Sequence, residues 1–227
     1  MTGRGRKSLK RAQGEETRAT LLQTGAELFA RNGYNGVSMR TLAAEAGVNL
    51  ATVSYHFGGK AGLYEAIIHK INEVRDQIFP PTGAVRARLA EAGETPEERA
   101  EVVDWFMSAL IDGLLVRTDF LWGVVIISRE LVHPTEIFSK METEFFNPNL
   151  ESLSVLVKGT AAHCRDETDA IITGHLIVSI IIKLLESHTL ICKRLGWDSY
   201  QGHHKTIEAI VKTRIRGLLG LPMENAQ

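Results

Sequence analysis

Apolar residues recur along most of the chain at steps of three and four, and no long alternation of apolar and polar residues is present. Such spacing is typical of amphipathic helices rather than strands. Proline is scarce, with six residues in 227. The clearest stripe consists of Leu63, Tyr64, Ile67, Ile68, Ile71, Val74 and Ile78. The pattern predicts an all-α protein.

The first 80 residues predict a small bundle with two short helices in succession. Ser38 and Asn49 each precede a helical segment, and both residue types are favoured at helix N-caps. Gly47, in "AGVN", permits a sharp turn between the two segments. We therefore expect a helix-turn-helix, with an ordinary helical hairpin as the alternative. The helices expected here span 15–31, 38–46, 49–56 and 60–79.

The remainder predicts a larger helical bundle. The stretch "TPEE", Thr95 to Glu98, combines a cap, a proline in the first turn and a capping box. Residues 82–95 show no clear apolar period, so we expect them to connect two modules. Further helices are expected at 95–116, 119–132, 135–146, 149–162, 167–195 and 199–218. The predicted division is a flexible basic arm (1–13), a helix-turn-helix domain (14–60), a connecting helix (61–81) and a C-terminal domain (82–227).

Charge is unevenly distributed, although the formal net charge is only −1. Residues 1–80 carry 11 Lys and Arg against 7 Asp and Glu, whereas the rest carries 15 against 20. A basic module beside an acidic one suggests that the basic part meets a polyanion. A basic leader without any partner is the alternative on charge alone.

Several function classes are disfavoured by the sequence. Cys164 and Cys192 form neither a disulfide framework nor a Cys-x-x-Cys metal motif, and the adjacent His203 and His204 are poorly spaced for one metal ion. No local motif joins a nucleophile to a base. The most apolar stretch, residues 170–192, contains charged residues that would be costly in lipid. We expect no enzyme, metal, cofactor or membrane span, and a cytoplasmic location.

Residues 15–64 resemble the DNA-binding domain of the TetR family of bacterial repressors. The resemblance lies in "LLQTGAELFARNGYNGVSMRTLAAEAGVNLATVSYHFGGKAGLY". Its matching positions are Phe29, Gly33, Tyr34, Ser38, Ala43, Ala46, Gly47, Val48, Tyr55, His56, Phe57 and Lys60. The chain departs from the family pattern at Ser54, where Tyr is common, and at Gly59, where Ser or Asn is common. The C-terminal part is similar to a CerR-like subgroup.

The third predicted helix carries the chemistry for reading DNA. An α-helix fits the major groove, where Asn can bond adenine and Thr or Ala can touch a thymine methyl group. Hydroxyl, imidazole and ammonium groups nearby can bond phosphates. The alternatives are capping alone for Asn49 and simple solvation for Thr52 and Ser54. The predicted DNA-binding residues are Ser38, Arg40, Asn49, Leu50, Ala51, Thr52, Ser54, Tyr55, His56 and Lys60.

One recognition helix covers too little sequence to be selective, so a homodimer on a near-palindromic operator is expected. The predicted dimer surface comprises Ile180, Leu184, Ile191, Ile207, Val211 and Ile215. The resemblance implies a small-molecule effector bound in the C-terminal half. Its predicted contacts are Trp105, Phe106, Leu110, Trp122, Ile126, Arg129, Phe138, Met141 and His175, with core packing as the alternative for each.

These expectations describe a ligand-responsive transcriptional regulator, more specifically a repressor that the effector releases from DNA. The alternative is a protein-interaction module on the same fold, with DNA binding secondary or lost. The joint after the recognition helix contains Gly58, Gly59 and Gly62. An exposed helical glycine costs about 1 kcal/mol relative to Ala. We therefore expect Gly62 to make this joint compliant.

Overall fold

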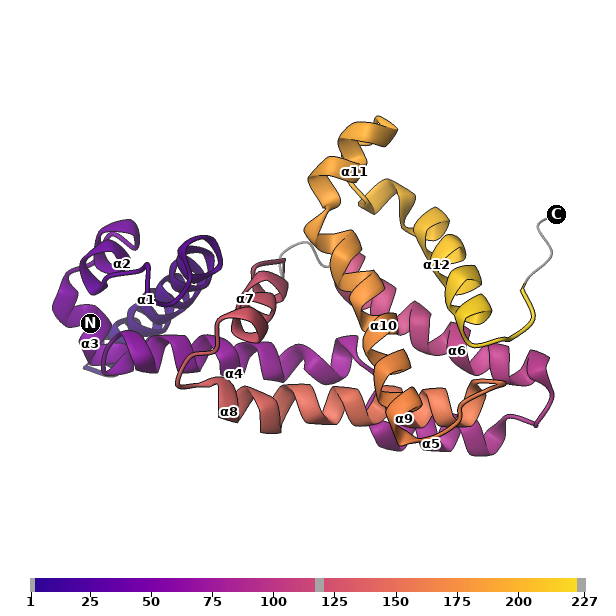
Figure 1. The fold of residues 1–227 in the computed structure, drawn as a ribbon. Coiled ribbons are helices and arrows are strands. Elements are labelled where there is room, and N and C mark those ends of the chain that lie inside the picture. Colours follow the sequence, from indigo (N-terminus) through magenta and orange to yellow (C-terminus); the bar gives the residue numbers. More distant parts are fainter. Residues whose placement is uncertain (1–2, 117–120, 224–227) are drawn as a thin grey trace. The chain divides into compact units, whose positions relative to one another are not determined.

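The computed structural model describes residues 3–116 and 121–223, and those residues form helices and no strands (Figure 1). The chain divides into two compact units. Unit 1 contains residues 1–73 and 122–138, and unit 2 contains residues 74–121 and 139–227. The all-α prediction is confirmed. The units differ from the expected domain division, because a segment from the middle of the chain belongs with the N-terminal helices.

Unit 1 contains the predicted N-terminal helices and one more. They are α1 (Gly3–Asn32), α2 (Met39–Glu45), α3 (Leu50–Phe57), the larger part of α4 (Lys60–Ile78) and most of α7 (Leu121–Val132). The core includes Phe29, Leu42, Val53 and Ile67, each at most 1% exposed. The stripe predicted on α4 faces this core, since Leu63 and Ile71 are fully buried.

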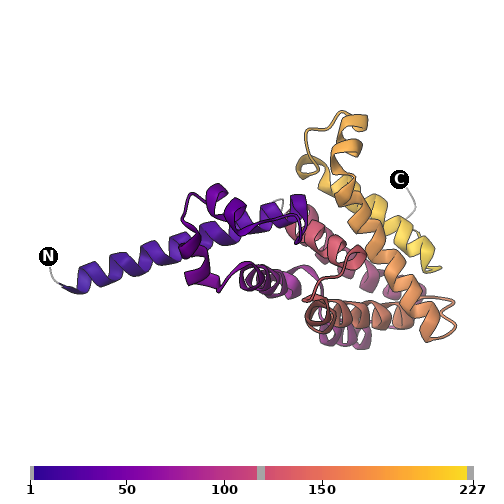
Figure 2. The same ribbon diagram turned by 60° about the vertical axis from the view of Figure 1, so that its left-hand side comes forward.

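The first helix is longer than expected. The sequence predicted a flexible arm through residue 13, but α1 is a single helix from Gly3 (Figure 2). Arg, Ala, Gln and Glu, which dominate residues 11–16, are good helix formers. Arg11 also pairs with Glu15 one turn later, at 3.2 Å. The basic residues and weak apolar periodicity of the first 13 positions are compatible with a solvent-exposed helix as well as with a flexible arm.

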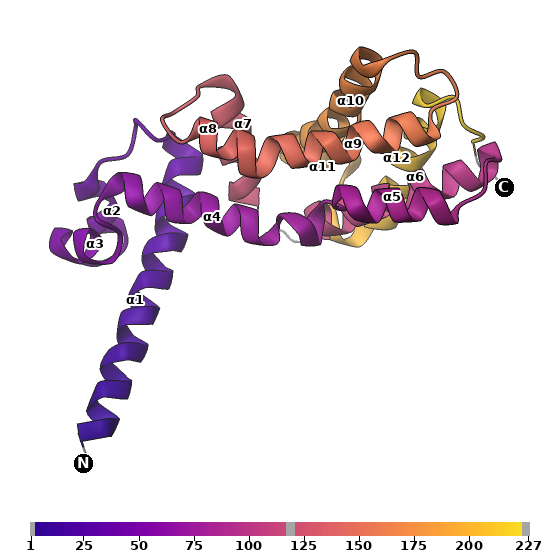
Figure 3. The same cartoon turned by 90° about the horizontal axis from the view of Figure 1, so that it is seen from below.

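Unit 2 is a bundle built around α9. Its elements are α5 (Thr82–Glu91), α6 (Pro96–Ile111), the π-helix η1 (Asp112–Val116), α8 (Phe138–Met141, from Ser139 on), the π-helix η3 (Glu142–Phe146), α9 (Asn147–Thr160), α10 (Glu167–Glu186), α11 (His188–Leu195), the 3₁₀-helix η4 (Gln201–His203) and α12 (His204–Leu218). Helix α9 packs against α5, α6 and α10 (Figure 3), and α12 packs against α6. The capping box at the start of α6 is confirmed, with Thr95 and Glu98 bonding each other's backbone N–H.

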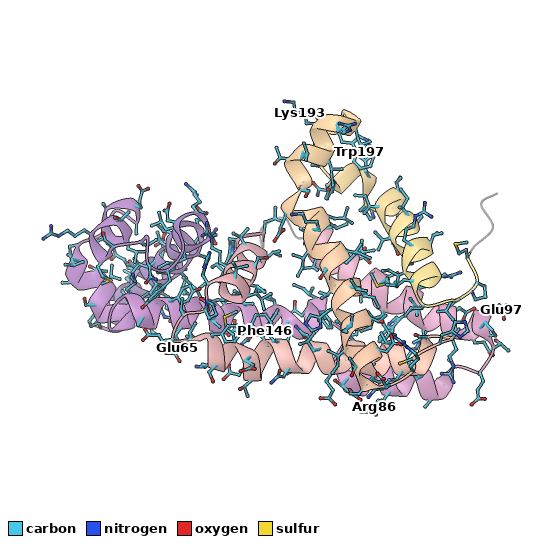
Figure 4. The ribbon with its side chains drawn as sticks, in the orientation of Figure 1. Glu65, Arg86, Glu97, Phe146, Lys193 and Trp197 are labelled. Atoms are coloured by element: carbon cyan, nitrogen blue, oxygen red, sulfur yellow. The ribbon has the colours of Figure 1, made fainter. Side chains whose placement is uncertain are left out.

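Two predictions about unit 2 were wrong. Residues expected to connect two modules form α5, which follows Pro81 and buries Val85 against the bundle. The long helix expected at 167–195 breaks at Ser187 into α10 and α11. The Tyr200 hydroxyl donates to the Leu184 carbonyl at 2.9 Å, within one turn of the break. Lys193 and Trp197 lie at the far end of the α11 segment (Figure 4).

A buried carboxylate links α12 to α6. Glu208 is 6% exposed and accepts hydrogen bonds from Ser108 at 2.7 Å and Lys205 at 3.0 Å. The Lys212 ammonium lies 2.6 Å from Oε1, the same carboxylate oxygen that Ser108 bonds. Burial raises the pKa of Glu208, but the hydrogen bonds from Lys212, Ser108 and Lys205 outweigh it and lower the pKa to about 2. The carboxylate therefore stays charged inside unit 2.

Candidate nucleic-acid interface

Short-range hydrogen bonds fix the beginnings of α2 and α3. The Ser38 hydroxyl accepts the Thr41 backbone N–H at 3.0 Å, and the Asn49 side-chain carbonyl accepts the Thr52 N–H at 2.9 Å. Both N-caps were predicted, and both are confirmed. Between the helices Gly47 has a φ of 65°, a conformation that glycine adopts at little cost. The predicted helix-turn-helix is therefore present.

Helix α3 presents a polar and small-residue face outward. Val53 is fully buried, whereas Tyr55 is 85% exposed and Leu50 is 45% exposed. Ala51 and Ser54 are also exposed. This one-sided burial leaves a face available to a groove. The base and phosphate contacts expected of these residues, and of the exposed Ser38 and Arg40, remain predictions.

Asn49 and Thr52 are partly committed to each other. The Asn49 side-chain oxygen accepts from both the backbone N–H and the hydroxyl of Thr52, each at 2.9 Å. Asn49 therefore caps α3 with its side-chain oxygen. Its amide N–H groups are the donors that it could direct to a base. The rings of Tyr55 and His56 lie edge to face near the end of the helix, with 5.1 Å between their centroids.

Lys60 has intramolecular partners that the sequence did not indicate. Its ammonium donates to the Val37 carbonyl at 3.0 Å and lies 4.2 Å from the centre of the Tyr34 ring. Sequence reasoning also missed Arg18 of α1, which is exposed. Its guanidinium lies 5.1 Å from the centre of the Phe57 ring. Two cations therefore flank the end of α3, and a phosphate contact of Lys60 remains a prediction.

The glycines after α3 are required by backbone geometry. Gly58 and Gly59 have φ values of 73° and 138°, which other residues adopt only with strain. A Cβ on Gly62 would lie 1.9 Å from the Phe57 carbonyl oxygen. The expectation that Gly62 merely softens the helix is therefore corrected, because a steric contact excludes any side chain there.

The residues predicted to contact an effector fall into both units. Phe106, Leu110 and Met141 are fully buried in unit 2. His175 is exposed, and its ring Nδ1 lies 3.0 Å from the Ile171 carbonyl in its own helix. Trp105, in unit 2, lies beneath the Arg88 guanidinium, 5.9 Å from its ring centre. The residues in unit 1 are Trp122, Ile126, Arg129 and Phe138.

Arg129 has structural partners in unit 1, and its contact with an effector stays a prediction. Its Nε donates to the Ala30 carbonyl at 2.9 Å and its Nη2 to the Arg31 carbonyl at 2.8 Å. The neighbouring Glu130 is 1% exposed and is bonded within unit 1. No sequence pattern signals these contacts, because the partners lie about a hundred residues away.

Helices α5 and α9 form a hollow of about 480 Å³ in unit 2. Its lining consists of Arg86 (labelled in Figure 4), Leu89, Val155, Lys158 and Gly159. Both cations already face carboxylates, since Arg86 lies 3.7 Å from Glu151 and Lys158 pairs with Glu167. None of the predicted effector contacts lines this hollow.

The predicted dimer surface requires correction. Ile207, Val211 and Ile215 are at most 7% exposed, on the buried side of α12. Other apolar residues of α10 and α12 face outward: Ile172 (56% exposed), Leu176 (49%), Ile180 (36%), Ile210 (54%) and Leu218 (43%). Of the predicted set, Ile180 belongs to this outward face, whereas Leu184 and Ile191 are half-buried.

Helix α10 is unusually apolar for one so poorly buried. By length and composition it is the one described helix that could cross a membrane, with a mean hydropathy of 1.7, and 28% of that segment is buried. Helix α12 also has exposed apolar residues, Ile210 and Leu218. The exposed residues of the two helices together form a candidate protein-protein surface.

Comparison with known proteins agrees with the geometry. Residues 21–67 match the model of the tetR family of bacterial regulatory proteins. Residues 100–220 match the C-terminal domain of the HTH-type transcriptional dual regulator CecR. CecR of Shigella flexneri is 25% identical over 190 residues, covering 83% of this chain and 84% of that protein. A probable regulator of Bacillus subtilis, YttP, is 37% identical over 57 residues, covering 25% of this chain and 28% of that protein.

Solved structures of low sequence identity share the fold. The hemolysin II regulator HlyIIR has a TM-score of 0.59 at 19% identity, covering 91% of this chain and 98% of that one. AibR, in complex with isovaleryl coenzyme A and operator DNA, has a TM-score of 0.62 at 15% identity, covering 91% and 100%. The C-terminal match supports the subgroup that the sequence analysis called CerR-like, and its family model carries the name CecR. The chain therefore belongs to the TetR family of bacterial regulatory proteins, in the subgroup with a CecR-type C-terminal domain, and is a transcriptional regulator rather than an enzyme.

Proposed function

We propose that this regulator binds a near-palindromic operator as a homodimer, represses transcription there and is released by a small-molecule effector in the cytoplasm. The observation that carries the proposal is the capped helix α3, whose outward face exposes Leu50, Ala51, Ser54 and Tyr55. A buried Val53 on the opposite side holds that face away from the core. Such a helix is the usual reader of the major groove.

Dimerisation is proposed through the outward faces of α10 and α12. Ile172, Leu176 and Ile210 are each about half exposed, at 56%, 49% and 54%. Several large apolar side chains exposed on one helix face often mark an interface. A two-fold dimer would also supply two recognition helices for half-sites about 34–36 Å apart.

Effector binding is proposed for the C-terminal half. The AibR structure contains both an acyl-coenzyme A and operator DNA, which supports the idea that this fold can hold a small molecule and DNA. A thermal-shift screen of small molecules would identify the chemical class of the effector by the compounds that raise the melting temperature of this protein. CecR is named a dual regulator, so a promoter-reporter measurement with and without the gene decides the sign of regulation.

The central experiment is selection of bound sequences from random double-stranded DNA, followed by footprinting of the selected site. A symmetric site of two half-sites, bound by a dimer in sedimentation, supports the proposal. A folded dimer that selects no sequence, even at low salt, would favour the protein-interaction module instead. Tyr55→Ala should weaken binding to the selected site, whereas Lys193→Ala, at the far end of the α11 segment, should not.

A further inference from the structure

The last turn of α1 is completed by a residue from α7. Carbonyl groups at a helix C-terminus lack partners within the helix. Gly33, with a φ of 71°, supplies its N–H to the Phe29 carbonyl at 2.8 Å. The Arg129 guanidinium supplies two more donors, to Ala30 and Arg31, at 2.9 and 2.8 Å. Its positive charge also lies at the negative end of the helix dipole.

The next residue along α7 bonds a different helix. Glu130 accepts the Tyr64 hydroxyl of α4 at 2.6 Å, and it accepts the backbone N–H and hydroxyl of Thr135 at 3.0 and 2.9 Å. Three hydrogen bonds compensate a carboxylate that is 1% exposed. Burial, and then the bond to Glu130, raise the pKa of Tyr64, so its hydroxyl remains a donor.

Both contacts lie beside residues 33–37, which connect α1 to α2. Arg129 bonds Ala30 and Arg31 just before this connection, and Glu130 bonds Tyr64, whose ring packs against Tyr34 within it. Tyr34 packs against Phe29 and Tyr64, with ring centroids 5.9 and 4.9 Å apart. Its hydroxyl donates to Glu136, beyond the end of α7, at 3.4 Å. On the far side of this connection Lys60 binds the Val37 carbonyl. The next residue, Ser38, caps α2.

We propose that Arg129 and Glu130 are positioning residues for operator recognition. Arg129 holds the end of α1 and Glu130 holds the Tyr64 ring of α4. Through these neighbours they position residues 33–37, and this connection sets the orientation of α2 and α3 on the rest of unit 1. Neither residue touches DNA or effector in this role. The inference rests on the proposed function, because it concerns preference for an operator. It also implies that a shift of α7, a segment from the middle of the chain, would change the orientation of α2 and α3.

Arg129→Met tests this in the full-length protein, because Met keeps a similar stem but cannot donate. Affinity for the selected operator should fall by about tenfold (~1.4 kcal/mol). Affinity for random DNA and the salt dependence should stay at wild-type values, since no phosphate contact is lost. Tyr64→Phe should reduce operator preference in the same direction, and Arg129→Lys should restore part of it. Arg86→Met, an exposed arginine of unit 2, is the matched control and should change neither affinity.

Two results with Arg129→Met would overturn the inference. Equal losses on operator and random DNA, with a lower salt slope, would make Arg129 a phosphate contact. Lower unfolding stability with intact operator preference would make it merely structural. If Arg129→Met fails to fold, Tyr64→Phe, which removes one hydroxyl, decides instead, and intact operator preference in that variant overturns the inference. Wild-type protein without any operator preference would instead refute the proposed function, and this inference with it.

Discussion

Lys60→Met isolates the contribution of one ammonium group beside the recognition helix. Met retains an unbranched apolar stem but loses the hydrogen bond to the Val37 carbonyl, at 3.0 Å, and the contact 4.2 Å above the Tyr34 ring. A hydrogen bond to a charged group contributes about 1.5–3 kcal/mol, and an exposed cation–π contact about 0.5–1 kcal/mol. Lys60 is partly exposed, so the lower ends apply and we expect a loss of about 2 kcal/mol in unfolding free energy.

The same variant measures whether Lys60 binds phosphate. An ammonium group has three donors, and the Val37 carbonyl uses one of them. If a phosphate takes another, the slope of log K against log salt falls by about 0.9 in the variant. We expect that decrease, together with weaker binding to operator and random DNA alike.

Urea unfolding at fixed protein concentration and salt titration of DNA binding are the assays. Lys70→Met is the matched control, because Lys70 lies on the same helix and makes a surface pair with Glu73 at 3.2 Å. Its unfolding free energy should change by less than about 0.5 kcal/mol. If Lys60→Met is as stable as that control, the contacts with Val37 and Tyr34 contribute nothing, and an unchanged salt slope removes Lys60 from the interface.

Three further outcomes are expected. Gly62→Ala should destabilise the protein by about 1–3 kcal/mol, since its Cβ would meet the Phe57 carbonyl oxygen at 1.9 Å; a stabilised variant in urea unfolding would contradict this. The pKa of Glu208 is lowered from 4.5 to about 2, so its contribution to the unfolding free energy is present above about pH 5 and is lost as pH falls toward 2. Over that range the unfolding free energy of the wild type should fall by about 3 kcal/mol more than that of Glu208→Gln, and parallel pH profiles of the two proteins would refute this. Ile210→Asp should weaken the dimer at least tenfold in sedimentation velocity by placing a charge in an apolar contact, whereas Ala209→Ser should not; a wild type that is monomeric at every concentration would remove the proposed interface.

Local structure was well determined by the sequence. Ser38, Asn49 and the pair Thr95–Glu98 cap their helices as predicted, because each signal acts within three residues of backbone. The stripe on α4 likewise identified its buried face. The pattern failed for α5, where arginines and alanines conceal a helix with a single buried valine. The helix-turn-helix and its outward face therefore follow from short-range signals in the amino-acid sequence.

Contacts between distant parts of the chain were decided only by tertiary structure. Ile207 and Ile210 have the same chemistry, yet one is 7% exposed and the other 54%, because only packing against α6 selects the inner face of α12. Arg129 was predicted as an effector contact, which stays a prediction, and only the fold shows that it also bonds the end of α1, where Ala30 lies 99 positions earlier in the chain. A spacing rule reports which residues share a helix face. It contains no information about which partner the fold brings to that face. The sequence therefore determined the capped helix α3 and its exposed face, whereas the tertiary structure determined which distant residues bond the helices around it.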